Sequence, residues 1–330
     1  MLVETNSKQY KGVSMLNDQW AGVFAATLCP FRKDLSIDDE NLHQYATYLS
    51  GVKGMKGLVC NGHTGEIMGL RAAERAEVTR QFGRAASRKV KIISGVCAEG
   101  SFEAIDHALA AKEAGADAIL LMPPHHWLRF GRTPDAAVGF FQDVALGANI
   151  PIILHQYPSW TKASYSLKEL LEIVQIPQVV ALKMGTRDMS RLDHEYRVLR
   201  KAAPHIPHLS CHDEYLLISL LAGAEGALVG FAGFVPELII ELVNTALSGD
   251  LSRIDEVKDL VYRMNKIVYR FGEPSSDAHQ RMKVAMTLQG RFSSMDVRPP
   301  LRPLTAQEVQ RIKSELADSG YDAWQAKRGV

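Results

Sequence analysis

The chain has 330 residues, of which 46% are hydrophobic and 23% are charged, a composition typical of globular proteins with a buried core. Its 38 basic and 37 acidic residues leave a formal net charge of +1, without the basic excess that nucleic-acid binding requires. No apolar run approaches the roughly 20 residues that span a bilayer. Met1 to Asn17 lack the apolar stretch of a secretory signal. Composition therefore predicts a globular protein with no nucleic-acid partner and no membrane association.

The cysteine pattern is not typical of a zinc site or a disulfide framework. Cys29, Cys60, Cys97 and Cys211 are widely spaced, form no CxxC pair, and lie in or just after apolar runs. Small buried thiols of this kind indicate a reducing compartment, so we expect a cytoplasmic protein.

Short apolar runs alternate with longer amphipathic segments over about the first 250 residues. Eight runs have the length and composition of buried strands: Gly22–Phe31, Gly57–Gly62, Lys91–Ala98, Ala118–Pro124, Ile150–Tyr157, Val179–Thr186, His208–Glu214 and Gly226–Gly230. The segments that follow them predict helices: Asp38–Val52, Arg71–Ser87, Phe102–Ala116, Pro134–Gly147, Ser166–Val174, Met189–Ala203, Tyr215–Ala222 and Val235–Ser248. Eight strand–helix units predict an α/β fold of the (β/α)8 TIM barrel type. A doubly wound open sheet is the alternative, but the first run lacks the glycine-rich turn of such sheets.

Beyond residue 250 the pattern is helical. Three helices are predicted, over Leu251–Phe271, Ser276–Gly290 and Thr305–Lys327. We therefore expect an N-terminal arm at 1–20, a catalytic barrel at 21–250 and a C-terminal three-helix extension at 251–330. The extension is expected to pack on the outside of the barrel or to support oligomerisation.

Lys183 is the most informative single residue. It follows the apolar run Val179 to Leu182, so it lies inside a strand, at the end where barrel active sites form. Burial disfavours the charged form of a lysine, and imine formation with a ketone requires an uncharged amine. The alternative is a structural lysine paired with a carboxylate such as Asp188 or Asp213.

A second motif, Gly62-His63-Thr64-Gly65, forms a glycine-bounded turn after the second strand. Successive backbone N–H groups in such a turn make an anion-binding nest, and Thr64 adds a hydroxyl donor. A carboxylate or phosphate would fit, whereas the alternative is an ordinary loop. Glu66 is expected to brace this loop rather than to do chemistry.

These motifs, with Pro158 after the fifth strand and the segment Val297–Thr305 before the last helix, resemble the dihydrodipicolinate synthase / N-acetylneuraminate lyase family. The resemblance covers roughly residues 20–318. It implies a TIM barrel with a three-helix extension and no cofactor. It also implies that Lys183 is a Schiff-base lysine and that the loop around Thr64 and Gly65 holds the carboxylate of a 2-oxo acid. A homotetramer built from tight dimers is usual in the family.

The chain departs from the family pattern at several positions. His155 stands where the family has its general acid–base tyrosine, and Tyr157 shares its strand face, so either residue can be the proton shuttle. The ordinary pKa of a histidine suits this role better. Trp160 replaces an arginine that grips a second carboxylate, and His63 replaces the first loop threonine. His126 corresponds to a tyrosine lent by the neighbouring subunit, with one or two residues of uncertainty in the alignment.

Three residues near the expected barrel mouth complete the predicted binding site. Trp127 and Trp160 indicate a less anionic, aromatic distal end of the substrate, unless they pack within their loops. Gly230, after the eighth strand, is expected to let the backbone approach the substrate. A phosphate cup is the other use of such a glycine.

The sequence thus predicts a lyase that acts on a pyruvate-like 2-oxo acid through a Schiff base. Aldol cleavage or condensation, dehydration and deamination share this intermediate and stay open. One alternative is a metal-dependent barrel hydrolase that uses His63, His126, His155 and His212. The other is a non-catalytic barrel that binds a small ligand, although a binding module has no need of a buried amine.

Overall fold

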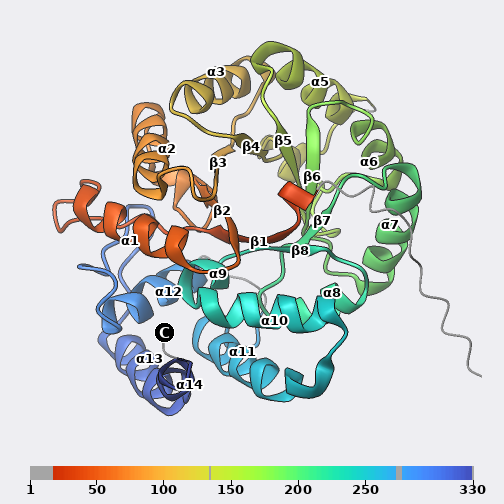
Figure 1. The fold of residues 1–330 in the computed structure, drawn as a ribbon. Helices are drawn as coiled ribbons and strands as arrows, with labels where there is room; N and C mark the ends of the chain where they lie inside the picture. Colours follow the sequence, from red (N-terminus) through yellow and green to blue (C-terminus); the bar gives the residue numbers. More distant parts are fainter. Residues whose placement is uncertain (1–17, 134, 273–276, 329–330) are drawn as a thin grey trace, which may run out of the picture.

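The strands form one closed parallel barrel in chain order, with β1 paired to β8 (Figure 1). The computed structural model describes residues 18–133, 135–272 and 277–328. The strands are β1 Gly22–Ala26, β2 Met55–Cys60, β3 Lys91–Val96, β4 Ala118–Leu121, β5 Ile152–Gln156, β6 Val179–Met184, β7 His208–Ser210 and β8 Gly226–Val229. Each overlaps a predicted run, so the predicted (β/α)8 barrel is confirmed. The doubly wound sheet is wrong, because β1 and β8 close the ring.

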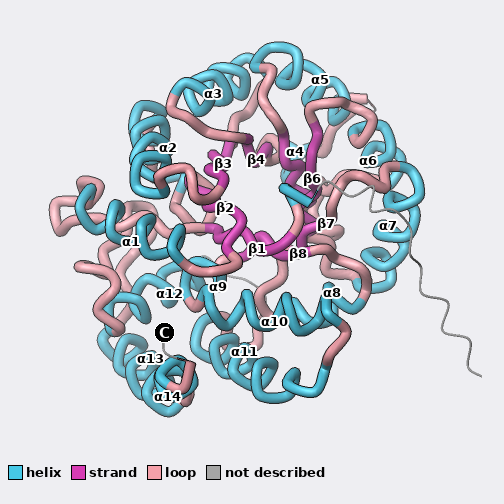
Figure 2. The backbone as a smooth tube through the Cα atoms, viewed as in Figure 1, coloured by secondary structure: helices cyan, strands magenta, loops and turns pink. Residues whose placement is uncertain are grey.

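Helices follow the strands, and the longer ones form a ring around the barrel (Figure 2). They are α1 Asp39–Gly51, α2 Ala72–Ala86, α3 Ser101–Glu113, α4 His126–Phe130, α5 Ala136–Ala148, α6 Leu167–Ile173, α7 Met189–Ala202, α8 Leu216–Leu221, α9 Phe231–Phe234 and α10 Pro236–Ser248. A capping box forms at the start of α6, where Ser166 and Glu169 exchange hydrogen bonds. Pro134, the first residue of the predicted helix Pro134–Gly147, lies outside the described residues. Within the described part of the chain, no helix has the length and apolar character needed to cross a membrane.

The barrel has two apolar layers because successive strand residues point to opposite faces. One buried cluster, which includes Phe24, Ala181 and Leu209, fills the interior of the barrel. A larger cluster, which includes Leu182, packs between the strands and the helices. Since Ala181 faces inward and Leu182 outward, Lys183 faces the interior.

The C-terminal extension lies against one side of the barrel, next to α10 (Figure 1). It contains η3 Leu251–Arg253, α11 Ile254–Val268, α12 Asp277–Leu288, α13 Ala306–Asp318 and α14 Tyr321–Ala326. The third predicted helix is two helices, because Gly320 adopts a left-handed φ of 75° between them.

The predicted arm at 1–20 lies outside the described residues except at its end, where η1 covers Asp18–Trp20. Trp20 is buried with the residues of the barrel interior rather than free in an arm. Its ring also receives the Lys91 ammonium, 4.7 Å from its centroid. A large indole therefore helps to fill the barrel.

Candidate active site

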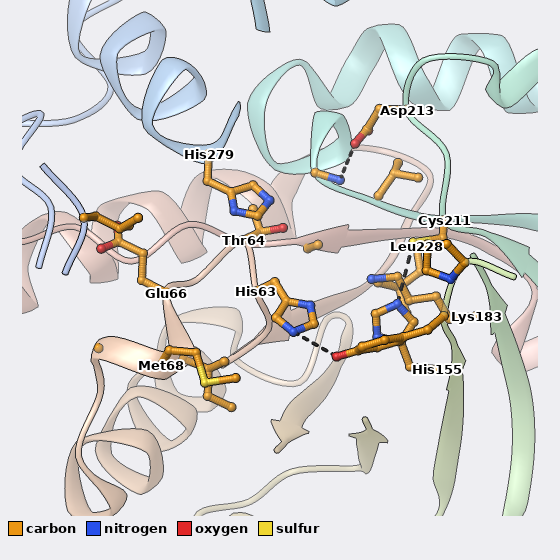
Figure 3. Close-up of a pocket in the computed structure, with 18 of the residues that line it drawn as sticks. His63, Thr64, Glu66, Met68, His155, Lys183, Cys211, Asp213, Leu228 and His279 are labelled. Atoms are coloured by element: carbon orange, nitrogen blue, oxygen red, sulfur yellow. Dashed lines mark hydrogen bonds between the residues drawn. The ribbon is translucent and has the colours of Figure 1, made fainter. Parts of the chain in front are cut away.

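A cavity of about 850 Å³ opens at the carboxyl ends of the strands (Figure 3). This is the face on which active sites of such barrels form. Residues from strands, from the following loops and from the extension line it: His63, Thr64, Glu66, Met68, His155, Tyr157, Trp160, Lys183, Arg187, Cys211, Asp213, Gly230, Tyr269, His279, Arg298 and Leu301. The cavity thus brings Lys183, His155, Tyr157, His63, Thr64, Trp160 and Gly230 together.

Lys183 projects from β6 into the cavity and is 8% exposed. It pairs in register with His155 of β5, so the two side chains lie side by side on the inner face. Within the described residues, no carboxylate forms an ion pair with Lys183. Asp188 caps α7 through the amide of Arg191, and Asp213 is bonded elsewhere. Neither Asp188 nor Asp213 therefore pairs with Lys183, which argues against a purely structural role for this lysine.

Tyr157 lies at the centre of a hydrogen-bonded group. Its hydroxyl is 3.0 Å from the Nε2 atom of His63 and 3.0 Å from the Nε2 atom of His125. The His155 ring packs edge-on against Tyr157, with ring centroids 4.9 Å apart. His155 and Tyr157 share one strand face, as two residues of spacing require. A phenol that can donate to one imidazole and accept from the other links the two histidines.

Burial sets the protonation states of these groups. Burial, followed by the positive charge of Lys183, lowers the pKa of His155 well below its usual 6.5 and that of His63 to about 3. Burial also lowers the pKa of His125 and raises that of Tyr157 well above 10. Near neutral pH the imidazoles are therefore uncharged and the phenol keeps its proton. The expectation that His155 keeps an ordinary histidine pKa is wrong, because its ring is enclosed.

The loop after β2 presents Thr64 to the cavity. Neither the N–H nor the hydroxyl of Thr64 bonds to another group in the described part of the chain. The Gly65 N–H already donates to the Gly62 carbonyl at 3.1 Å, so it serves the turn. A Cβ at Gly65 would lie 3.1 Å from the Thr27 carbonyl oxygen, which explains why a glycine suits this close approach to β1. Thr64 therefore keeps two unused donors, whereas Gly62 and Gly65 shape the loop.

A buried ion pair braces this loop, as expected for Glu66. Its partner is Lys283 of α12, whose Nζ also donates to the Asp296 carbonyl at 3.0 Å. The second carboxylate oxygen of Glu66 accepts the Arg298 amide at 3.1 Å. The C-terminal extension thus holds the loop that carries Thr64.

Asp213 organises the opposite wall. Its carboxylate accepts hydrogen bonds from the Phe231 amide at 2.7 Å, the Gly230 amide at 3.3 Å and the Tyr269 hydroxyl at 2.7 Å. Burial raises the pKa of Asp213 to about 6, and these bonds oppose that rise. Gly230 leaves room here, since a Cβ would lie 3.0 Å from the Met282 methyl.

Two predicted mouth residues lie elsewhere. The His126 side chain is 47% exposed and bonds to Glu99 at 2.8 Å, outside this cavity. The neighbouring His125 points inward instead, so one of the two positions within the alignment uncertainty reaches the site. Trp127 is buried against Phe140 rather than lining the cavity, because α4 turns its ring toward α5.

The histidines do not converge on a metal position. His212 is buried and bonds to the Ser219 hydroxyl at 3.2 Å, and His126 faces Glu99. Across the described ranges, no group of three or more His, Cys, Asp or Glu side chains lies close enough to hold a metal ion. The geometry therefore does not support the predicted alternative of a metal-dependent hydrolase.

The sequence interpretation missed several lining residues from the extension. Tyr269, His279, Arg298 and Leu301 come from a segment expected only to pack outside or to join subunits. Burial lowers the pKa of His279 to about 4. For Arg298 and Leu301 the sequence did offer a signal, because both lie in the segment Val297–Thr305 that carries the family resemblance.

Comparison with known proteins gives one consistent family. A model of the dihydrodipicolinate synthetase family matches residues 19–319. The 4-hydroxy-tetrahydrodipicolinate synthase of Anaplasma marginale (strain Florida) is 28% identical over 297 residues, covering 90% of this chain and 94% of the relative. An uncharacterized DapA-like lyase of Rhizobium meliloti is 27% identical over 303 residues, covering 91% of this chain and 96% of the relative. The crystal structure of the chloride inhibited dihydrodipicolinate synthase from Acinetobacter baumannii, complexed with pyruvate, matches with a TM-score of 0.79 at 26% identity, covering 91% of this chain and 99% of that chain.

A closed (β/α)8 barrel with a lysine enclosed at its catalytic end defines the class I, Schiff-base-forming aldolase type. The chain belongs to the dihydrodipicolinate synthetase family, as a divergent member. It is a lyase that acts on a 2-oxo acid through a lysine Schiff base. The family match confirms the predicted resemblance and enzyme class, and it supports neither the hydrolase nor the binding-module alternative.

Proposed function

We propose that Lys183 forms the Schiff base with a pyruvate-like 2-oxo acid. The observation that carries this proposal is the enclosed amine of Lys183, which faces the cavity without a carboxylate partner among the described residues. A purely structural lysine at this depth would need such a partner. An amine free of one is available to attack a carbonyl carbon.

The chemistry follows from the imine. Nζ of Lys183 attacks C2 of the 2-oxo acid, the carbonyl oxygen leaves as water, and a C=N bond forms that becomes cationic on protonation. In aldol cleavage the electron pair of the C3–C4 bond moves into C2–C3, and the C4 hydroxyl loses its proton to become an aldehyde. The resulting enamine takes a proton at C3, and water then releases pyruvate. In dehydration or deamination the same imine instead loses a proton from C3, and the electrons of the resulting enamine expel the C4 hydroxyl as water or the C4 amine as ammonia.

Thr64 is our proposed anchor for the carboxylate of the 2-oxo acid. Its N–H and hydroxyl are two donors without a partner among the described residues, and both can reach an oxyanion. Gly62 and Gly65 act indirectly by shaping the turn, and His63 borders the same end of the cavity. Gly230 lines the opposite side of the cavity, where its backbone can approach the bound acid.

Tyr157 is our proposed proton shuttle. Its hydroxyl joins His63, which borders the cavity, to the half-buried His125, so a proton can pass along the group as each hydroxyl bond switches direction. His155 takes a different part in the proposal. Its ring lines the cavity beside Lys183, so it can contact substrate next to the Schiff base.

We also propose that the protein is a cytoplasmic homotetramer. In this assembly His126, which lies outside the cavity of its own subunit, would contribute to the cavity of a neighbouring subunit. All four cysteines are free thiols, which suits a reducing compartment. Leu128 and Phe130 lie exposed on α4 beside His126, and such apolar side chains suit a subunit interface. Sedimentation analysis of the purified protein tests the assembly.

Borohydride trapping tests the proposed function. Pyruvate and sodium borohydride should add one stable mass, located at Lys183 by peptide mass spectrometry. Lys183→Ala should lose both the adduct and turnover, whereas Lys168→Ala, at an exposed position on α6, should keep both. Full activity of the Lys183→Ala variant, or an adduct at another lysine, would refute the assignment. A panel of 2-oxo acids, assayed for pyruvate release and for dehydrated product, separates aldol cleavage from elimination.

A further inference from the structure

The cavity is much larger than a pyruvate unit requires. Its volume of about 850 Å³ lies in the range of roughly 300–1,000 Å³ that holds drug-sized ligands. The pyruvate unit of the proposed substrate lies between Lys183 and Thr64. The remaining space extends toward the loops that follow the strands, and the rest of the substrate must lie there.

The wall of that outer space is apolar. Met68, on η2 Ile67–Gly69, is 52% exposed, and Trp160, on the loop after β5, is 59% exposed, yet both line the cavity. In the view of Figure 3, Met68 lies on the far side of His63 from Lys183. Leu301 joins them from the extension. Large apolar side chains exposed around one cavity mark a surface that binds apolar groups.

The cations of the cavity are already paired. Arg187 forms an ion pair with Glu214, and Arg298 forms two hydrogen bonds to Glu74, at 2.7 and 2.9 Å. Lys183 is committed to the imine. Among the lining residues that the structure describes, no unpaired guanidinium or ammonium therefore faces the outer space. A second carboxylate placed there would lose hydration without gaining a counter-charge, which is costly.

We propose that the part of the substrate beyond C4 is an uncharged apolar group, branched alkyl or aryl, which packs against Met68, Trp160 and Leu301. In the aldol direction, the second substrate is then an uncharged apolar aldehyde rather than a carboxylated semialdehyde. This inference rests on the proposed Schiff-base function and names the substrate class of that same site.

A shape-matched pair of 2-oxo acids tests the inference. In 5-methyl-2-oxohexanoate an isopropyl group replaces the terminal carboxylate of 2-oxoglutarate, so only charge and polarity differ. Each acid is titrated with borohydride, and the trapped fraction is measured by intact mass, with pyruvate as reference. We expect the isopropyl acid to reach half-trapping at a roughly tenfold lower concentration than 2-oxoglutarate, because a buried apolar contact discriminates by about that factor.

Variants of Trp160 and Met68 test whether these side chains determine the preference between the two acids. Trp160→Arg should shift the preference toward 2-oxoglutarate by supplying a cation, Met68→Lys should do the same from the other side, and Trp160→Phe should leave it unchanged. Equal or better trapping of 2-oxoglutarate by the wild-type protein overturns the inference while pyruvate trapping upholds the proposed function. An unchanged preference in both cationic variants overturns it as well. Absence of trapping with pyruvate itself removes the proposed function and this inference with it.

Discussion

Lys283 forms a buried ion pair with Glu66, a residue 217 positions away in the sequence. Lys283 belongs to α12, and Glu66 belongs to the loop after β2 that presents Thr64. The Lys283 ammonium also lies 4.4 Å from the centroid of the Phe31 ring. This contact connects the C-terminal extension directly to the proposed carboxylate site. The extension therefore holds part of the active site in place.

Lys283→Met should destabilise the protein by roughly 3–5 kcal/mol, because it leaves the Glu66 carboxylate buried without its partner. Urea unfolding measures this change. The double variant Glu66→Gln/Lys283→Met should recover much of the loss, since no charge is then left unpaired. We also expect pyruvate to half-saturate trapping at a higher concentration in Lys283→Met. Unchanged stability and unchanged trapping would show that the ion pair does not position the loop.

Tyr157→Phe should lower turnover by about a hundredfold, because it removes the hydroxyl that joins His63 and His125. Trapping at Lys183 should persist, since the amine is untouched. His155→Phe tests the other shuttle candidate and should affect formation of the imine as well as turnover. Steady-state rates and trapping kinetics separate the two effects. If neither variant slows turnover more than tenfold, the proton-shuttle proposal is wrong.

We expect kcat/KM to fall at acidic pH because of the Asp213 carboxylate. Its carboxylate holds the amides of Gly230 and Phe231 at the cavity wall, and its pKa is raised to about 6. Protonation below that pH weakens both bonds, so kcat/KM should fall there. Tyr269→Phe removes a hydroxyl bond that lowers this pKa, so the fall should move to higher pH. A pH profile in which the fall does not move in Tyr269→Phe would assign the fall to another group.

Buried neutral histidines predict acid sensitivity of the fold. Burial lowers the pKa of His208 from its usual 6.5 to about 3. Between pH 6.5 and 3 the His208 ring is therefore protonated in the unfolded chain but not in the folded chain. The free energy of unfolding falls as the pH falls through that range. One such group costs about 1.4 kcal/mol per pH unit there. His208→Phe keeps a ring against Tyr196 and should flatten the dependence of the unfolding free energy on pH. Equal slopes for the two proteins would contradict this origin.

Local pattern was enough to predict the scaffold. Short apolar runs separated by amphipathic segments predict alternating strands and helices, and eight such units without a glycine-rich first turn favour a closed barrel over an open sheet. The alternation of side chains along a strand also predicts that His155 and Tyr157 share a face. This prediction depends on strand geometry alone. It could therefore be made from one sequence.

Tertiary structure decided which loop residues meet. The sequence prediction named His126, with one or two residues of alignment uncertainty, but the start of α4 turns His125 toward Tyr157 and His126 toward Glu99. The protonation states of the histidines could not be predicted from the sequence either, because they depend on how completely other elements enclose each ring.

The contacts between the C-terminal extension and the active site could not be predicted from the sequence either, because they join residues far apart in the chain. Helical periodicity predicted its segments, although Gly320 divides the last one in two. That His279 and Leu301 line the cavity and that Lys283 meets Glu66 depend on how the extension docks against the barrel. A strand or helix is determined by neighbours along the chain. A site assembled from residues hundreds of positions apart is determined by packing, which leaves no periodic trace in the sequence.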